Sequence, residues 1–83
     1  MDIDYYMGKA MKSIENKVQP GQKFEVRHLF KDVEWGGLSK GERIYFGRLF
    51  SNTVKEGLIP GVTRIQKAEN NHAQYIKEKE NKK

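Results

Sequence analysis

The segment LSKGERIYFGRLFSNTVKEG, which runs from Leu38 to Gly57, constrains the fold most because both ends of a helix are marked in it. Ser39 and Glu42 have the spacing of a capping box, in which the serine hydroxyl accepts from the Glu42 amide and the glutamate accepts from the Ser39 amide. Gly57 suits the position after the last turn, where positive φ is cheapest for glycine. We therefore predict a helix over residues 39–56.

The predicted helix has an aromatic side and a basic side. At helical spacing, one side gathers Phe46, Leu49, Phe50, Thr53 and Val54. The opposite side gathers Lys40, Ile44, Arg48, Ser51, Asn52 and Lys55. Such a helix can pack on a core and still present cations to an anionic partner, so it favours a nucleic-acid-binding module over an enzyme.

Length and composition exclude several classes of protein. A chain of 83 residues holds one small core, and its lack of cysteine excludes disulfides and thiolate metal sites. No apolar run approaches the roughly 20 residues that a membrane helix needs. The first residues, MDIDYYMGKA, are acidic where a signal peptide is basic and apolar. We expect a soluble cytoplasmic protein with no membrane partner and no cofactor.

The net charge of +5 is concentrated in one part of the chain. The stretch from Lys40 to Lys67 has six basic and two acidic residues, whereas the remainder is nearly balanced. This asymmetry is typical of a phosphate-binding surface. The alternative interpretation is an ordinary solvated basic surface.

The chain before the marked helix reads as a helix, a short strand and a second short helix. Asp4 to Val18 has an apolar stripe at helical spacing, and Gln19 to Gly21 ends it. Lys23 to Val26 alternates like a strand, Arg27 to Lys31 is expected to be helical, and Asp32 to Gly37 is expected to be a turn.

The chain after Gly57 changes to the alternation of a β-hairpin. Strands over 62–68 and 73–77 flank an Asn-Asn pair at 70–71 that suits a two-residue turn. This turn pairs Ile65 with Ile76, both expected on the core side. The expected core is Met7, Ile14, Phe24, Leu29, Phe30, Leu38, Phe46, Leu49, Phe50, Ile65 and Ile76.

The order of elements predicts an α+β winged helix, with three helices, a small antiparallel sheet and a C-terminal β-hairpin wing. We expect one domain over residues 1–77 and a flexible charged tail over 78–83. In a winged helix the third helix enters the major groove and the wing contacts the flanking backbone. The strand at 23–26 can pair with the wing.

Duplex DNA is the favoured partner, and the residue types suggest individual roles. Arg48 and Asn52 suit guanine and adenine edges, Ile44 suits a thymine methyl group, and Lys40 and Lys55 suit phosphates. The residues expected at the DNA are Lys40, Arg43, Ile44, Arg48, Ser51, Asn52, Lys55, Arg64, Lys67, Asn70 and Asn71.

Two glycines inside the predicted helix lower its intrinsic helix propensity. Gly41 suggests close approach of a partner on the outward face. For Gly47 we favour close packing against a neighbouring helix.

Five features lie between Phe24 and Tyr75: the segment FEVRHLF, Trp35, the segments LSKGERIYFGRLF and GVTRIQKAENN, and Tyr75 itself. Together they resemble a group of small uncharacterised proteins of Gram-positive bacteria and their phages. The most specific part is the SKGER-x-x-x-G-R-x-F run from Ser39 to Phe50. The resemblance implies a compact winged-helix-like domain of phage or mobile-element origin, with no known activity. The amino-terminal helix lies outside it.

An enzyme is not expected. His28 and His72 are the only histidines and lie far apart, and the GxGxxG, GKS/T and HExxH motifs are absent. A different class remains open, since a small helical domain with exposed Tyr5 and Tyr45 also suits a module that binds and modulates a host protein. A homodimer is compatible with either function.

Overall fold

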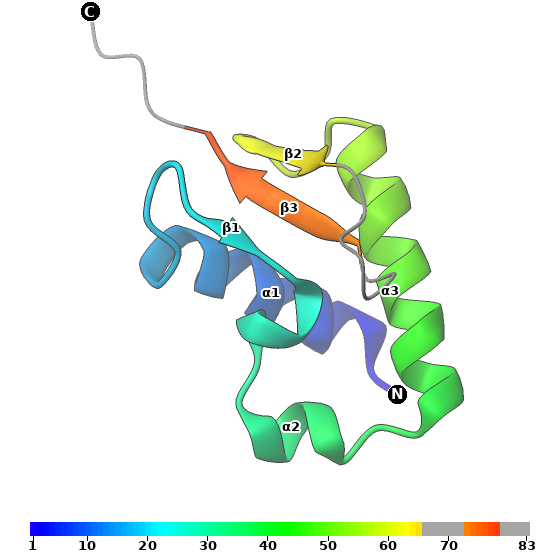
Figure 1. The fold of residues 1–83 in the computed structure, drawn as a ribbon. Helices are drawn as coiled ribbons and strands as arrows, with labels where there is room; N and C mark the ends of the chain where they lie inside the picture. Colours follow the sequence, from blue (N-terminus) through cyan, green and yellow to red (C-terminus); the bar gives the residue numbers. More distant parts are fainter. Residues whose placement is uncertain (66–72, 79–83) are drawn as a thin grey trace, which may run out of the picture.

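The computed structural model describes residues 1–65 and 73–78, which form an α+β arrangement compatible with a winged-helix-like fold. Within these residues three α-helices and a 3-10 helix pack beside a three-stranded antiparallel sheet (Figure 1). The elements in chain order are α1 (Ile3–Asn16), β1 (Lys23–Phe24), η1 (Val26–Leu29), α2 (Asp32–Gly36), α3 (Lys40–Lys55), β2 (Val62–Ile65) and β3 (Gln74–Lys77).

Helix α3 has the boundaries that the sequence predicts. The Ser39 hydroxyl accepts from the Glu42 amide at 3.1 Å, and the Glu42 carboxylate accepts from the Ser39 amide at 2.8 Å. The hydrogen bond from the Ser39 amide is the main reason why the pKa of Glu42 is lowered. Gly57 has a φ of 76°, the left-handed conformation expected after the last turn. The capping box and the glycine are therefore both confirmed.

The segment between β1 and α3 differs from the prediction. The structure has the 3-10 turn η1 in place of a helix over 27–31, and α2 in place of a turn over 32–37. Phe30 and Lys31 are extended and separate the two short helices. The Glu34 carboxylate accepts from the Lys31 amide at 3.3 Å, so a local cap starts α2 where the sequence suggested only a turn.

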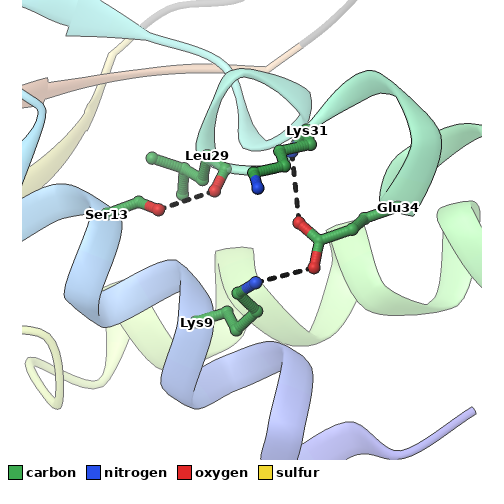
Figure 2. Close-up of polar contacts among 5 residues, drawn as sticks. All are labelled: Lys9, Ser13, Leu29, Lys31 and Glu34. Carbon is green, nitrogen blue, oxygen red and sulfur yellow. Dashed lines mark hydrogen bonds and ion pairs between the residues drawn. The ribbon is translucent and has the colours of Figure 1, made fainter.

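Two polar contacts fasten these short helices to α1 (Figure 2). The Ser13 hydroxyl donates to the Leu29 carbonyl at 2.7 Å, and the Lys9 ammonium donates to the Glu34 carboxylate at 2.7 Å. The hydrogen bond from Lys9 is the largest cause of the lowered pKa of Glu34. Residues 26–36 are thereby held against α1, beside the amino-terminal half of α3 (Figure 1).

Strand β3 is the centre of the sheet, in the order β1-β3-β2. The predicted pairing of the short strand with the hairpin is confirmed, because Phe24 pairs with Tyr75. The predicted hairpin register is wrong, since Ile65 pairs with Gln74 and Ile76 with Thr63. The Asn70-Asn71 turn lies outside the described residues.

The core face of the hairpin is also different from the prediction. Tyr75 is fully buried, and successive residues of a strand point to opposite faces, so Ile76 lies on the other face of β3. Ile76 and Ile65 are only partly buried. The error arose because an aromatic residue with a polar hydroxyl occupies the core position that the isoleucine was expected to fill.

The core is aromatic, and the underside of α3 is its centre. Phe46 and Phe50 are fully buried, and the Phe50 ring lies 5.0 Å from that of Tyr75. The predicted core members Ile14, Phe24, Leu29, Phe30, Leu38, Phe46 and Phe50 are confirmed, whereas Met7 and Leu49 are only partly buried. Buried residues that the prediction omitted are Ala10, Val18, Val54, Ile59, Val62 and Tyr75.

Ser39→Ala is predicted to lower the free energy of unfolding by about 1 kcal/mol, because the amide of Glu42 loses its capping acceptor. Ser39→Asp should retain most of the stability, since aspartate caps equally well. Urea denaturation of the three proteins measures the difference. Equal stability of the alanine and aspartate variants would contradict the role of this cap.

Phe50→Ala is predicted to lower the free energy of unfolding by roughly 3 to 5 kcal/mol, enough to unfold much of a domain this small. Leu58→Ala is the control, because Leu58 is 63% exposed and its truncation should change stability by less than about 0.5 kcal/mol. Circular dichroism during chemical denaturation compares them. A Phe50→Ala protein as stable as the control would mean that the buried face of α3 is assigned wrongly.

Candidate nucleic-acid interface

An open groove of about 870 Å³ lies along α3 on the side away from its aromatic face. Its other walls come from Glu25 to Arg27 at the start of η1, from Trp35 of α2, and from the ends of β2 and β3 nearest their connection. The α3 residues along it are Lys40, Arg43, Ile44, Gly47, Arg48, Ser51, Asn52 and Lys55.

The groove brings together most of the residues predicted to contact DNA. Eight of them line it: Lys40, Arg43, Ile44, Arg48, Ser51, Asn52, Lys55 and Arg64. The other three, Lys67, Asn70 and Asn71, lie outside the described residues. The helix and the hairpin thus contribute to one surface, although they are separate in the sequence.

The α3 side chains form two parallel rows along the groove. Residues four apart lie one above another on a helix, so Lys40, Ile44, Arg48 and Asn52 form one row. Arg43, Gly47, Ser51 and Lys55 form the second row. Ile44 is 48% exposed, which makes it an apolar group within an otherwise polar row.

The groove is strongly basic. Its six basic side chains are Arg27, Lys40, Arg43, Arg48, Lys55 and Arg64, and its one acidic side chain is Glu25. The Glu25 carboxylate lies 3.1 Å from the Arg27 Nε, which offsets its charge. Within residues 1–65 and 73–78, the α3 cations of the groove form no ion pair with a carboxylate. Clefts lined by one sign of charge focus the electrostatic field and attract ions of the opposite sign.

Tyr75 and Arg64 form the part of the groove that belongs to the sheet. They are cross-strand partners on β3 and β2 and therefore lie on the same face. Burial raises the pKa of the Tyr75 hydroxyl, and the opposing effects of Ser51 and the Arg64 charge are smaller. A tyrosine hydroxyl is protonated at neutral pH even at its ordinary pKa, so this one can donate a hydrogen bond.

Gly47 has a different role from the one predicted. A Cβ at this position would meet no atom within 4 Å, so no neighbouring helix packs closely against it, and the residue lines the groove instead. A Cβ at Gly41 would meet only the Ser39 hydroxyl oxygen, at 4.0 Å. Both glycines leave open space on α3, and at Gly47 this space belongs to the groove.

Sequence reasoning missed the far wall of the groove. Arg27 and Trp35 line it, but they were expected in a second helix and in a turn. Glu25 and Tyr75 were missed because strand pairing, and no local pattern, brings them beside α3. The cross-strand pairing of Phe24 with the hairpin was the signal that pointed towards this wall.

A family model described as a domain of unknown function, DUF1413, matches residues 9–77. The chain belongs to this family. Comparisons with curated proteins and with solved structures find no match. The DUF1413 match starts at Lys9 within α1 and ends at Lys77 in β3, so the whole groove lies inside it. It also includes most of the helix that lay outside the sequence resemblance.

Two other kinds of feature are absent from the described part of the DUF1413 chain. No group of three His, Asp or Glu side chains there is placed to hold a metal ion. No helix formed by these residues combines the length and the apolar character needed to cross a membrane.

Gly47→Ala is predicted to raise the free energy of unfolding by about 0.5 to 1 kcal/mol, because alanine favours the helix and the added methyl group meets no atom. Gly8→Ala in α1 is the matched variant, since its Cβ also enters open space, and it should give a similar gain. Thermal and urea denaturation measure both. Destabilisation by Gly47→Ala alone would show that the position is crowded.

Proposed function

We propose that this DUF1413 protein is a winged-helix-like DNA-binding protein that places α3 in the major groove of a duplex and the β2–β3 hairpin on the flanking backbone. The observation that carries the proposal is the groove itself, in which eight of the residues predicted to contact DNA, five of them basic, lie together with Arg27 and one neutralised acid. A transcriptional regulator of a phage or mobile element, acting in the cytoplasm of a Gram-positive bacterium, is the setting we propose.

The first row of α3 is proposed to read bases. Ile44, Arg48 and Asn52 are spaced one helical turn apart, and Arg48 and Asn52 are exposed. Arginine donates two hydrogen bonds to guanine, asparagine pairs with adenine, and an apolar side chain contacts the thymine methyl group. Lys40 and Lys55, near the two ends of the helix, are placed for phosphates on either side of these bases.

The second candidate function is binding of a host protein, and exposed tyrosines favour it. Tyr5 on α1 and Tyr45 on α3 are 51% and 58% exposed, and neither lines the groove. Tyrosine is enriched in protein interfaces. A protein partner at these residues predicts binding that Tyr45→Ser weakens, that Arg48→Ala leaves unchanged and that salt affects little.

A salt titration of binding to a selected duplex and a scrambled duplex tests the DNA proposal. For wild type, log K should fall with log salt at a slope of about 0.9 per neutralised phosphate. Lys55→Ala should lower that slope by about one unit and weaken both duplexes alike, since a phosphate contact carries no sequence information. Lys12→Ala in α1 is the control, because Lys12 is exposed and does not line the groove.

Arg48→Ala should behave differently from Lys55→Ala. It should cost about 1 to 3 kcal/mol on the selected duplex and less on the scrambled one, because a bidentate base contact is sequence-specific. A selected site with two-fold repeats would indicate a dimer. Absence of wild-type binding to either duplex at low salt would refute the DNA proposal and favour the protein partner.

Comparison of Gly47→Ala with Gly8→Ala distinguishes an effect on the groove from an effect on overall stability. Both are expected to be more stable, but only Gly47→Ala places a methyl group on the proposed DNA-contacting face. We therefore expect Gly47→Ala to weaken duplex binding and Gly8→Ala to leave it unchanged in the same assay. Equal affinity of the two variants would contradict close approach of the duplex to the middle of α3.

A further inference from the structure

The floor of the groove contains buried polar atoms that the rest of the described chain does not satisfy. The side-chain atoms without a hydrogen bond are the Arg64 Nε, the Tyr75 hydroxyl oxygen and the Glu25 Oε1, of which the Glu25 Oε1 still has an ion-pair partner in the Arg27 Nε at 3.1 Å. All three residues line the same groove. Leaving a buried polar group without a hydrogen bond destabilises the folded protein, and unpaired groups that persist often mark functional sites.

The sheet explains why these atoms come together. Tyr75 lies on the central strand, with Arg64 as its partner on one side and Phe24, which precedes Glu25, as its partner on the other. Arg64 and Tyr75 are therefore on adjacent strands at one level of the sheet, and Glu25 directly follows the end of β1 at Phe24. Ser51 of α3 lies close enough to the Tyr75 hydroxyl to oppose the rise in its pKa as a weak partner, but the two side chains do not have the geometry of a full hydrogen bond.

The chemistry of these atoms suits an oxyanion. The Arg64 Nε can only donate a hydrogen bond, and the Tyr75 hydroxyl, which is protonated at neutral pH like any tyrosine, can donate a second. Glu25 can only accept, but its charge is offset by the Arg27 Nε at 3.1 Å. The surrounding basic side chains favour a doubly charged ligand over a neutral one.

We propose that the Arg64 Nε and the Tyr75 hydroxyl form a seat for one phosphate group at the floor of the groove. Arg64 as a whole is only partly buried, and the proposal requires its side chain to rotate outward so that a phosphate reaches the two buried donor atoms. The phosphate belongs either to the backbone of the bound duplex, which rests on the proposed function, or to a free phosphate or small phosphorylated molecule, which does not.

Tyr75→Phe is the sharpest test because it removes one oxygen atom and keeps the ring, whose centroid lies 5.8 Å from that of Phe24 in a stacked pair and 5.0 Å from that of Phe50 in an edge-on pair. If the hydroxyl serves the ligand, stability should stay the same or rise while phosphate affinity falls about tenfold. If the hydroxyl serves the fold, stability should fall. Tyr45→Phe is the matched control, since this α3 tyrosine is exposed and outside the groove.

Arg64→Lys tests the second donor at constant charge. Lysine keeps the positive charge but lacks the Nε–H donor, so a seat of defined geometry should weaken about as much as with Tyr75→Phe. The double variant should bind little worse than either single variant, because each change breaks the same site. Unchanged phosphate affinity of Arg64→Lys would show that Arg64 acts through its charge alone, and this would overturn the seat.

The experiment is an NMR titration of the ¹⁵N-labelled full chain at constant ionic strength. One arm adds inorganic phosphate, a second adds duplex DNA, and a third adds the same duplex with neutral methylphosphonate linkages. Saturable phosphate-dependent shifts at Arg64, Tyr75 and Ser51 that Tyr75→Phe abolishes support the seat. Displacement of phosphate by the normal duplex, but not by the neutral one, assigns the phosphate to the DNA backbone.

The outcomes separate this inference from the proposed function. Tyr75-dependent binding of inorganic phosphate without duplex binding would sustain the seat and refute the DNA proposal. Duplex binding that is unchanged in Tyr75→Phe and Arg64→Lys, with no phosphate-dependent shifts, would overturn the seat and leave the DNA proposal intact.

Discussion

The packing of Phe46 and Phe50 beneath α3 is the constraint on which the rest of the structure depends. Both rings are fully buried, one helical turn apart. The centroid of the Phe46 ring lies 5.7 Å from that of Phe30, and the centroid of the Phe50 ring lies 5.0 Å from that of Tyr75. One ring therefore fixes α3 against the segment near α2, and the other fixes it against the sheet. With this face buried, the rows that begin at Lys40 and Arg43 must lie along the groove. The orientation of α3 about its own axis follows from the packing of its aromatic side, and this orientation decides where its basic side chains lie.

The far wall of the groove depends on contacts between elements that are distant in the sequence. The Lys77 ammonium at the end of β3 donates to the carbonyls of Ile14 and Val18, at 2.8 and 3.0 Å, where α1 ends. A cation at a helix carboxyl end also interacts favourably with the helix dipole. This contact holds β3 against α1, while Lys9 and Glu34 hold α2 against the same helix (Figure 2). Helix α1 thus holds β3 and α2, which both contribute residues to the groove, without lining the groove itself.

The sequence predicted local structure well where a single segment determines it, and poorly where pairing determines it. The α3 capping box and the two faces of α3 were recoverable because spacing along one segment encodes them. The strand-to-hairpin pairing was recovered from the order of elements, without its register. The register of Ile65 and the burial of Tyr75 were not, since two isoleucines side by side gave a plausible register that differs from the observed one by two residues. Tyr75 occupies the core position because its ring packs between Phe24 and Phe50. The α3 half of the groove was therefore predictable, and the half built from η1 and the sheet was not.

A glycine with open space around it is weak support for a function by itself, as Gly8 shows. Gly8 and Gly47 both lie within helices and both could accept a methyl group without contact, yet only Gly47 lines the groove. Three independent features coincide in the groove. They are the open space at Gly47, the basic side chains without carboxylate partners in the described chain, and the unpaired Tyr75 hydroxyl. Each feature lowers the stability of the free protein or leaves it unimproved, because glycine weakens a helix, like charges repel, and a buried hydroxyl loses its water. An anionic ligand offsets the repulsion between the like charges, gives the buried hydroxyl a partner and uses the open space at the glycine. The same substitutions are therefore expected to affect stability and binding differently.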